Sequence, residues 1–259
     1  MHFHLPKPLH GWREFTGEVG IIVIGVLIAL GAEQVVENVH WSSQLREART
    51  ALGYEIADSV GQGFEREHFY NCVEDRLDLL AATVDKAGET GRLPPLASPD
   101  APPFRTWLDA TWQTTMAGQS ASRFSPRELD LYGSLYTFVQ NLQQLGPREM
   151  TVWTRLDTVA GPGRAIEPAE VASLRSDISE ARLLNRVMTL SAIRLRQTAD
   201  AANVHYDQGV VRDYAKAPNS TFAICRPMDP KPPEHYGSAP LAGVLEHARK
   251  SKIILPEQR

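Results

Sequence analysis

The chain has 259 residues, a net charge of −4 and a mean hydropathy of −0.28, and 42% of its residues are hydrophobic. These values fit a packed soluble body with one added apolar segment. The slight negative charge and the lack of a basic stripe argue against nucleic acid as a partner.

Residues 12–41 have the length and composition of a membrane-spanning helix. At about 1.5 Å per residue, Trp12 and Trp41 would lie roughly 43 Å apart, close to the thickness of a bilayer with its headgroups. Tryptophan favours both edges of a bilayer. An uncharged run from Val19 to Ala32 lies between them, flanked by Glu18 and Glu33. We therefore predict one N-terminal transmembrane helix in contact with the lipid bilayer.

Two other interpretations of this stretch compete with a retained anchor. Lys7, Arg13 and the sequence Ala29-Leu-Gly31 loosely fit a signal peptide cleaved after Gly31. However, Glu14 and Glu18 are acidic where signal peptides are basic, and the helical pattern continues through residue 41. A buried helix of a soluble protein is the third interpretation, because the uncharged run covers only about 21 Å of a ~30 Å hydrocarbon core. The retained anchor is preferred.

The expected orientation leaves residues 1–11 in the cytoplasm and the bulk of the chain outside it. Positive charge differs little across the span, with Lys7 and Arg13 before it and Arg46 and Arg49 after it. A span so close to the N-terminus normally leaves the short end inside. In a bacterium, the protein would lie in the inner membrane with its bulk in the periplasm.

Small residues gather on one face of the expected membrane helix. At 100° per residue, Gly25, Ala29 and Ala32 fall within about 60° of the direction of Glu18. Such a stripe allows two transmembrane helices to pack closely. We expect this face to pair with a second copy or with a membrane protein partner, although Gly and Ala are also common in spans that do not pair.

The N-terminal segment also carries a family resemblance. Gly17-Glu-Val-Gly-Ile-Ile-Val-Ile-Gly-Val-Leu-Ile-Ala-Leu30, preceded by Trp12-Arg-Glu-Phe15, resembles the N-terminal signature of uncharacterised bacterial single-pass membrane proteins. Glu18 and Gly25 match positions that recur in that signature, and Trp41 matches its trailing tryptophan. The resemblance covers about the first forty residues. It implies a retained anchor and adds no activity, because the function of that family is unknown.

Residues 42–216 are expected to form an extracytoplasmic antiparallel helical bundle, so the predicted fold class is all-α. Few alternating β-branched runs and no Asn-Gly or Asp-Gly turns argue against strands. An apolar line with a period near 3.6 runs from Leu45 to Val84, which predicts that the membrane helix continues into a first long helix. Gly61-Gln-Gly63 should interrupt and kink this helix, and residues 88–103 should form an exposed loop.

The later helices are expected between Gly- and Pro-containing breaks, with the last one antiparallel to the first. They are a short helix over residues 104–116, one from the capping box Ser125-Pro-Arg-Glu128 to about Gln144, one over residues 149–159 after Gly146-Pro147, and a last long helix from Glu167-Pro168 to about Val210. Residues 217–259 are expected to be a mostly irregular tail with a short helix at 241–250.

Cys72 and Cys225 are the only cysteines. In a periplasmic domain, they would form a disulfide that ties the tail to the first long helix. The alternative is two unpaired small apolar side chains, the usual state in a reducing compartment. The expected location favours the disulfide.

No cofactor, metal site or catalytic site is predicted. His68 lies one helical turn before Cys72, with Glu65 on the preceding turn, a spacing that could form part of a zinc site. No second pair of ligands with matching spacing exists, so a solvated helix surface is the better interpretation. The sequence contains neither a Gly-x-Ser-x-Gly turn nor a phosphate-binding glycine-rich loop after a strand.

Three functions remain consistent with these features. The first is a membrane-anchored interaction or scaffold module that associates with itself or with a membrane partner. The second is a periplasmic ligand-binding or sensing module, whose signal would have to pass through a partner because so few residues precede the span. The third and least favoured is a periplasmic enzyme.

Overall fold

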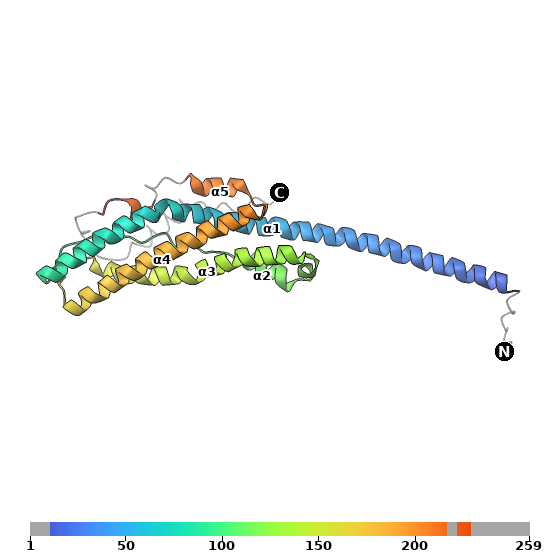
Figure 1. Ribbon diagram of the computed structural model, residues 1–259, viewed down its shortest axis with the longest axis horizontal. Coiled ribbons are helices and arrows are strands. Elements are labelled where there is room, and N and C mark those ends of the chain that lie inside the picture. The colour runs from blue at the N-terminus through green and yellow to red at the C-terminus, as the bar shows by residue number, and fades with distance from the viewer. Residues whose placement is uncertain (1–10, 217–221, 229–259) are drawn as a thin grey trace, which may run out of the picture. The chain divides into compact units, whose positions relative to one another are not determined.

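The computed structural model describes residues 11–216 and 222–228, and this part of the chain is mostly helical (Figure 1). The sheet in the described residues is one antiparallel pair, in which Arg92 faces Ala165 and Leu93 faces Arg164. The all-α fold class is confirmed. In chain order, the elements are α1 (Trp12–Thr90), β1 (Arg92–Leu93), α2 (Ala110–Ala117), η1 (Gln119–Arg123), α3 (Pro126–Leu156), η2 (Asp157–Val159), β2 (Arg164–Ala165), α4 (Pro168–Ala201), α5 (Gln208–Ala215) and η4 (Ala223–Cys225).

The chain divides into two compact units, and the long helices contribute to both. Unit 1 comprises Met1–Phe64, Thr106–Gln143 and Ser191–Lys216, and unit 2 comprises Glu65–Arg105, Gln144–Leu190 and Ala217–Arg259. Each unit therefore contains one stretch of α1, one of α3 and one of α4. The short helix expected at residues 241–250 lies outside the described residues.

In unit 2, α4 runs antiparallel to α1, as the sequence predicted. Arg182 of α4 pairs with Glu74 and Asp78 of α1, whereas Arg175, earlier on α4, pairs with Asp85, later on α1. Apolar residues from α1, α3, α4 and the segment after α5 form one core between these stretches. Its fully buried members include Val73, Leu77, Leu80, Val84, Val152, Leu156 and Ala181.

In unit 1, α3 lies parallel to α1. Arg49 of α1 pairs with Glu128 at the start of α3. Six residues further along α1, the carboxylate of Glu55 accepts a hydrogen bond of 2.7 Å from the hydroxyl of Tyr136. The contacts advance in the same direction on both helices, so the two helices point the same way.

The expected interruption at Gly61-Gln-Gly63 is absent, because α1 is helical throughout this stretch. A β-carbon at Gly61 would lie 2.2 Å from the ring of Tyr214, and one at Gly63 would lie 3.2 Å from the β-carbon of Ala192. The two glycines therefore allow α5 and α4 to approach α1 closely. Tertiary packing outweighs the low helix propensity of glycine here.

The expected break at Gly146-Pro147 is also absent, since α3 continues from Pro126 to Leu156 with Pro147 inside it. A proline inside a helix removes one hydrogen bond and costs about 3 kcal/mol. Val152, Trp153 and Leu156, which follow the proline on α3, are all buried. Burial of this apolar face compensates for the local cost, and the prediction of two separate helices was wrong.

Two other boundaries differ from the prediction. Helix α2 begins at Ala110 instead of Phe104, because the carboxylate of Glu55 accepts hydrogen bonds from the free backbone N–H groups of Thr111 and Trp112. Helix α4 ends at Ala201 instead of near Val210. It ends in a Schellman motif, in which Asn203 has a φ of +50° and the N–H of Val204 bonds to the carbonyl of Ala199.

The segment after α1 is partly buried, whereas an exposed loop was expected. Leu93 and Leu96 lie in the core of unit 2. The backbone of Leu96 exchanges two hydrogen bonds of 2.9 Å with Gly161. The two leucines that flank Pro94-Pro95 therefore fix a segment that its local composition predicts to be a loop.

Candidate functional site

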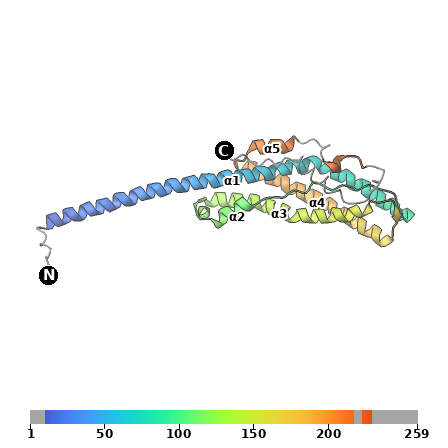
Figure 2. The ribbon, with the colours of Figure 1, turned by 180° about the vertical axis from the view of Figure 1, so that it is seen from behind.

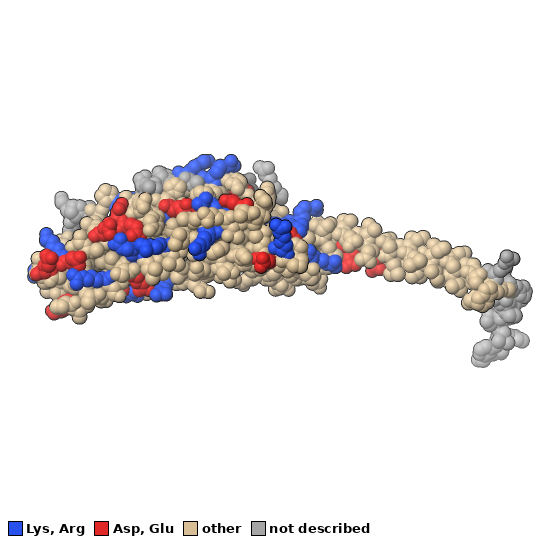
Figure 3. Space-filling view, viewed as in Figure 1, with Lys and Arg blue, Asp and Glu red and all other residues tan. Residues whose placement is uncertain are grey.

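The N-terminal part of α1 stands clear of the other described helices (Figure 2), and the face of it seen in Figure 3 is almost free of charge. Its most apolar 18-residue window has a mean hydropathy of 2.3, and none of that window is buried. Ile21, for example, is 74% exposed. The length, composition and exposure of this stretch make it a candidate for a single membrane span.

The residues predicted to pack against a partner lie on this stretch, and Glu18, Gly25, Ala29 and Ala32 are all exposed. A β-carbon added at Gly25 would meet no described atom within 4 Å. Within the described part of the chain, this face of α1 is therefore uncovered.

The body of unit 1 first touches α1 just beyond this stretch, through η1. The guanidinium carbon of Arg123 lies 4.8 Å from the ring centre of Trp41. The same side chain approaches the carboxylate of Glu37 at 3.5 Å, and the indole N–H of Trp41 donates to Glu37 at 3.0 Å. These contacts mark the position on α1 where the bare apolar helix ends and the folded body begins.

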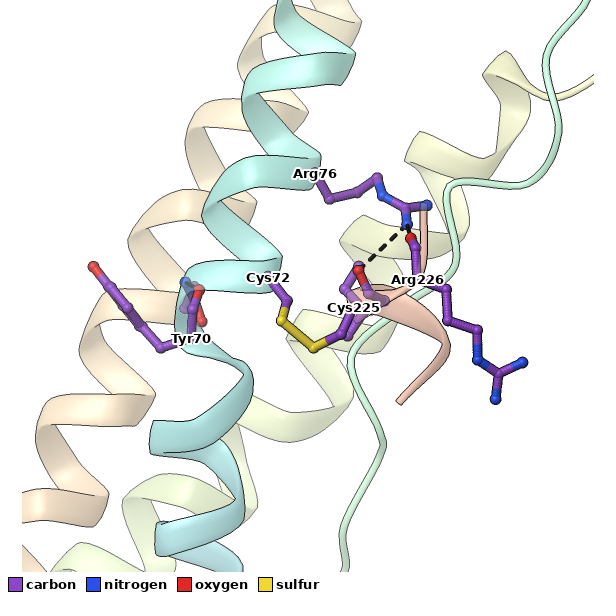
Figure 4. Close-up of a disulfide and its surroundings, with 7 residues drawn as sticks. Tyr70, Cys72, Arg76, Cys225 and Arg226 are labelled. Atoms are coloured by element: carbon purple, nitrogen blue, oxygen red, sulfur yellow. Dashed lines mark hydrogen bonds between the residues drawn. A yellow bond between two sulfur atoms is a disulfide. The ribbon is translucent and has the colours of Figure 1, made fainter. Parts of the chain in front are cut away.

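A disulfide joins Cys72 of α1 to Cys225 of η4, the pairing that the sequence analysis favoured, with sulfur atoms 2.09 Å apart (Figure 4). One turn along α1, the buried guanidinium of Arg76 donates hydrogen bonds of 2.6 Å to the carbonyls of Pro99 and Arg226. Burial lowers the pKa of Arg76. The disulfide and this arginine together fix two irregular segments against α1.

The three side chains considered as part of a zinc site, Glu65, His68 and Cys72, do not form a common binding site. His68 is exposed, Cys72 is in the disulfide, and the buried carboxylate of Glu65 accepts two hydrogen bonds of 2.6 Å from Arg105. The described residues contain no group of three His, Cys, Asp or Glu side chains placed to hold a metal ion. Glu65 is thus a buried ion-pair partner, although its position in the sequence predicted a solvated helix surface.

An ion pair that is buried on both sides crosses unit 2. Arg66 donates hydrogen bonds of 2.9 and 2.5 Å to the two oxygens of Glu149, and both side chains are less than 10% exposed. The amide of Asn185 lies 3.5 Å from the same guanidinium and donates at 2.7 Å to Glu74. This network joins α1, α3 and α4 and opens into none of the described cavities, so we assign it a structural role.

An open cleft lies in unit 1, beside the start of the folded body. Its volume is about 670 Å³, within the range of small-molecule sites. One wall comes from α1, one from the start of α3, and the third from the connection between α4 and α5 together with α5. The lining includes Arg46, Arg49, Tyr54, Glu128, Tyr132 and Arg212.

Among the residues that the structure describes, some of the charged side chains around this cleft have an ion-pair partner and others do not. Glu128 is engaged by Arg49 at 2.8 Å and by the backbone N–H and hydroxyl of Ser125, the capping box predicted from the sequence. Burial alone would raise the pKa of Glu128, but these hydrogen bonds outweigh it and the pKa is lowered. Within the described part of the chain, Arg46 and Arg212 line the cleft without a carboxylate in ion-pair distance.

Sequence reasoning identified the apolar span and the two cysteines, but it missed the cleft. The cleft combines Arg46, Glu128 and Arg212, which lie far apart in the sequence. It also depends on Gly53, where a β-carbon would lie 2.5 Å from the carbonyl oxygen of His205. No local pattern indicates that these segments meet.

Comparison of the chain with protein-family models, with curated proteins and with solved structures finds no match.

Proposed function

We propose that this chain is a single-pass membrane protein whose function is interaction: its N-terminal helix anchors it and pairs with a second copy or with a membrane protein partner. The observation that carries this proposal is the bare apolar stretch of α1, which continues without interruption into the folded helices. A soluble core helix would bury such a stretch. In this proposal, the chain belongs with the bacterial single-pass proteins whose N-terminal signature it resembles.

The two carboxylates at the ends of the span support pairing. Glu18 and Glu33 are fifteen positions apart, so each lies about 11 Å from the midpoint of a helix centred between them. A carboxylate at that depth is costly when it faces lipid alone. Small residues on the same face as Glu18 would let a second helix approach closely enough to hydrogen-bond with it.

The proposed location is the inner membrane, with the N-terminus in the cytoplasm and the helical body in the periplasm. The disulfide between Cys72 and Cys225 supports an oxidising compartment. Acid trapping and thiol alkylation of whole cells test this location. The full chain should run as one oxidised species whose mobility shifts on reduction and in Cys72→Ser or Cys225→Ser variants. Free thiols in growing cells would contradict a periplasmic body.

Crosslinking in membranes tests the pairing face. Replacing Gly25 with leucine puts a large side chain on the stripe, so Gly25→Leu should abolish crosslinks between copies or to a partner. Gly20→Leu is the matched control, because Gly20 lies on the opposite side of the helix and meets no described atom either. Equal loss in both variants, or in neither, would refute pairing through this face.

A further inference from the structure

We propose that the cleft of unit 1 binds an amphiphile with an oxyanion head, either a lipid drawn from the adjoining membrane surface or a soluble molecule of the same chemistry. The proposal goes beyond the interaction function above. Its lipid source depends on the proposed membrane anchor, whereas binding of a soluble amphiphile does not.

The cleft offers positive charge that the protein itself leaves unused. Glu128 is occupied by Arg49 and Ser125, and Asp207 accepts a hydrogen bond of 2.6 Å from the backbone of Gly209 at the start of α5. Arg46 and Arg212 remain as exposed guanidinium groups with no carboxylate partner among the described residues. Guanidinium groups form paired, charge-assisted hydrogen bonds with phosphate and carboxylate.

The walls of the cleft suit a hydrocarbon chain. Tyr132, Val204 and Tyr206 line it, and each is less than 10% exposed, while Tyr54 on α1 is 56% exposed. Burial raises the pKa of Tyr132 and of Tyr206, whose hydroxyl also donates to Asp200, so neither tyrosine adds a negative charge to the cleft. An anionic head with an apolar chain matches this combination better than a small free anion does.

The position of the cleft supports a ligand that comes from the membrane. Arg46 follows Trp41 by five residues, which is about 8 Å along α1. Trp41 and Arg123 mark the end of the bare apolar helix. If that end lies at the headgroup level, as we propose, the cationic mouth of the cleft opens within reach of lipid headgroups.

The soluble arm of the test uses the full chain in nanodiscs made only of phosphatidylcholine. Hexyl phosphate should bind to the wild-type protein, measured by calorimetry, about tenfold more tightly than ethyl phosphate, because the longer chain buries more apolar surface. The double variant Arg46→Gln/Arg212→Gln should weaken hexyl phosphate binding by about tenfold or more. Arg194→Gln is the control, because Arg194 is an exposed arginine of α4 that does not line the cleft.

The membrane arm uses nanodiscs that contain phosphatidylglycerol, with retained lipid counted by mass spectrometry of the released protein. Retention that falls in the double variant and persists in Arg194→Gln assigns the ligand to the membrane. Hexyl phosphate binding without lipid retention supports the site with a soluble ligand. Three results overturn the proposal. The first is that neither hexyl phosphate nor phosphatidylglycerol binds, and the second is that ethyl and hexyl phosphate bind equally. The third is that Arg194→Gln loses as much binding as the double variant does. The pairing proposed for Gly25 is judged separately by its crosslinks.

Discussion

The ring of Tyr214 on α5 fills the space beside Gly61 on α1, where any β-carbon would lie 2.2 Å from a ring carbon. Its hydroxyl donates a hydrogen bond of 2.7 Å to Asp58, one turn earlier on α1. Helix α5 is only eight residues long, and helices of that length are marginal on their own. The position of α5, and with it one wall of the cleft, therefore depends on the absence of a side chain at Gly61.

Replacing Gly61 with alanine should destabilise unit 1 even though alanine is the better helix former. The added methyl group has to displace the ring of Tyr214, and overpacking of this kind costs about 1–3 kcal/mol. Gly133→Ala is the matched control, because Gly133 is also inside a long helix but has no described atom within 4 Å of an added β-carbon. That variant should gain up to about 1 kcal/mol from helix propensity. Urea unfolding of the full chain in detergent measures both, and stabilisation by Gly61→Ala would contradict the packing described here.

The features that the sequence predicted correctly are those with local signals. The capping box at Ser125 and Glu128 forms as expected, and α4 starts at Pro168. The apolar span can be recognised from local composition alone, because it contains fourteen consecutive uncharged residues. The pairing of the two cysteines followed from the expected periplasmic location, where a disulfide is favoured over two free thiols.

The features that the sequence missed depend on contacts between distant segments. Glycine and proline inside α1 and α3 suggested breaks, but Tyr214 and the buried face after Pro147 outweigh these local preferences. The start of α2 is set by Glu55, some fifty-five residues earlier in the chain. The same reason explains why the cleft could not be predicted, because its walls come from three separate parts of the sequence.

The buried pair of Arg66 and Glu149 should respond very differently to single and double replacement. Glu149→Leu alone leaves a buried guanidinium without its carboxylate and should cost about 3–5 kcal/mol of unfolding free energy. Arg66→Met combined with Glu149→Leu removes both charges and should recover most of that loss. Urea unfolding of the three proteins checks this. A double variant as unstable as the single one would mean that the pair contributes more than charge compensation.

The contact between Arg123 and Trp41 should place Trp41 at the membrane surface. Lipids that carry a quencher near the headgroup should reduce the fluorescence of the full chain in nanodiscs, because tryptophan favours that depth. Trp107 and Trp153 are buried in the protein and should be quenched much less. Trp12 is expected at the opposite bilayer surface and is 80% exposed, so the test uses a Trp12→Phe background. In that background, the quenching should largely disappear when Trp41 is also replaced with phenylalanine. If it persists unchanged in that variant, then the folded body does not begin at the headgroup level.

Acid should weaken unit 1 partly through Asp109. Its carboxylate accepts hydrogen bonds from the amides of Gln113, Gln140 and Gln143. Burial alone would raise the pKa of Asp109, but the three donors outweigh it, so the pKa lies below its ordinary value of 3.8. The folded state thus binds this proton less readily than the unfolded chain does. The resulting stability is fully present above the unfolded pKa and is lost as the pH falls through the folded pKa.

Asp109→Asn should therefore lower the unfolding free energy at pH 7 and make its decline in acid shallower than in the wild type. An amide in place of the carboxylate can accept fewer of the three hydrogen bonds and brings a donor of its own toward the glutamine amides. Asp130→Asn, at an exposed position of α3, is the control and should leave the curve nearly parallel to that of the wild type. The measurement is urea unfolding between pH 7 and about pH 3. If Asp109→Asn shifts the curve without changing its slope in acid, the carboxylate contributes only packing, because a group whose proton affinity is unchanged by folding cannot make stability depend on pH.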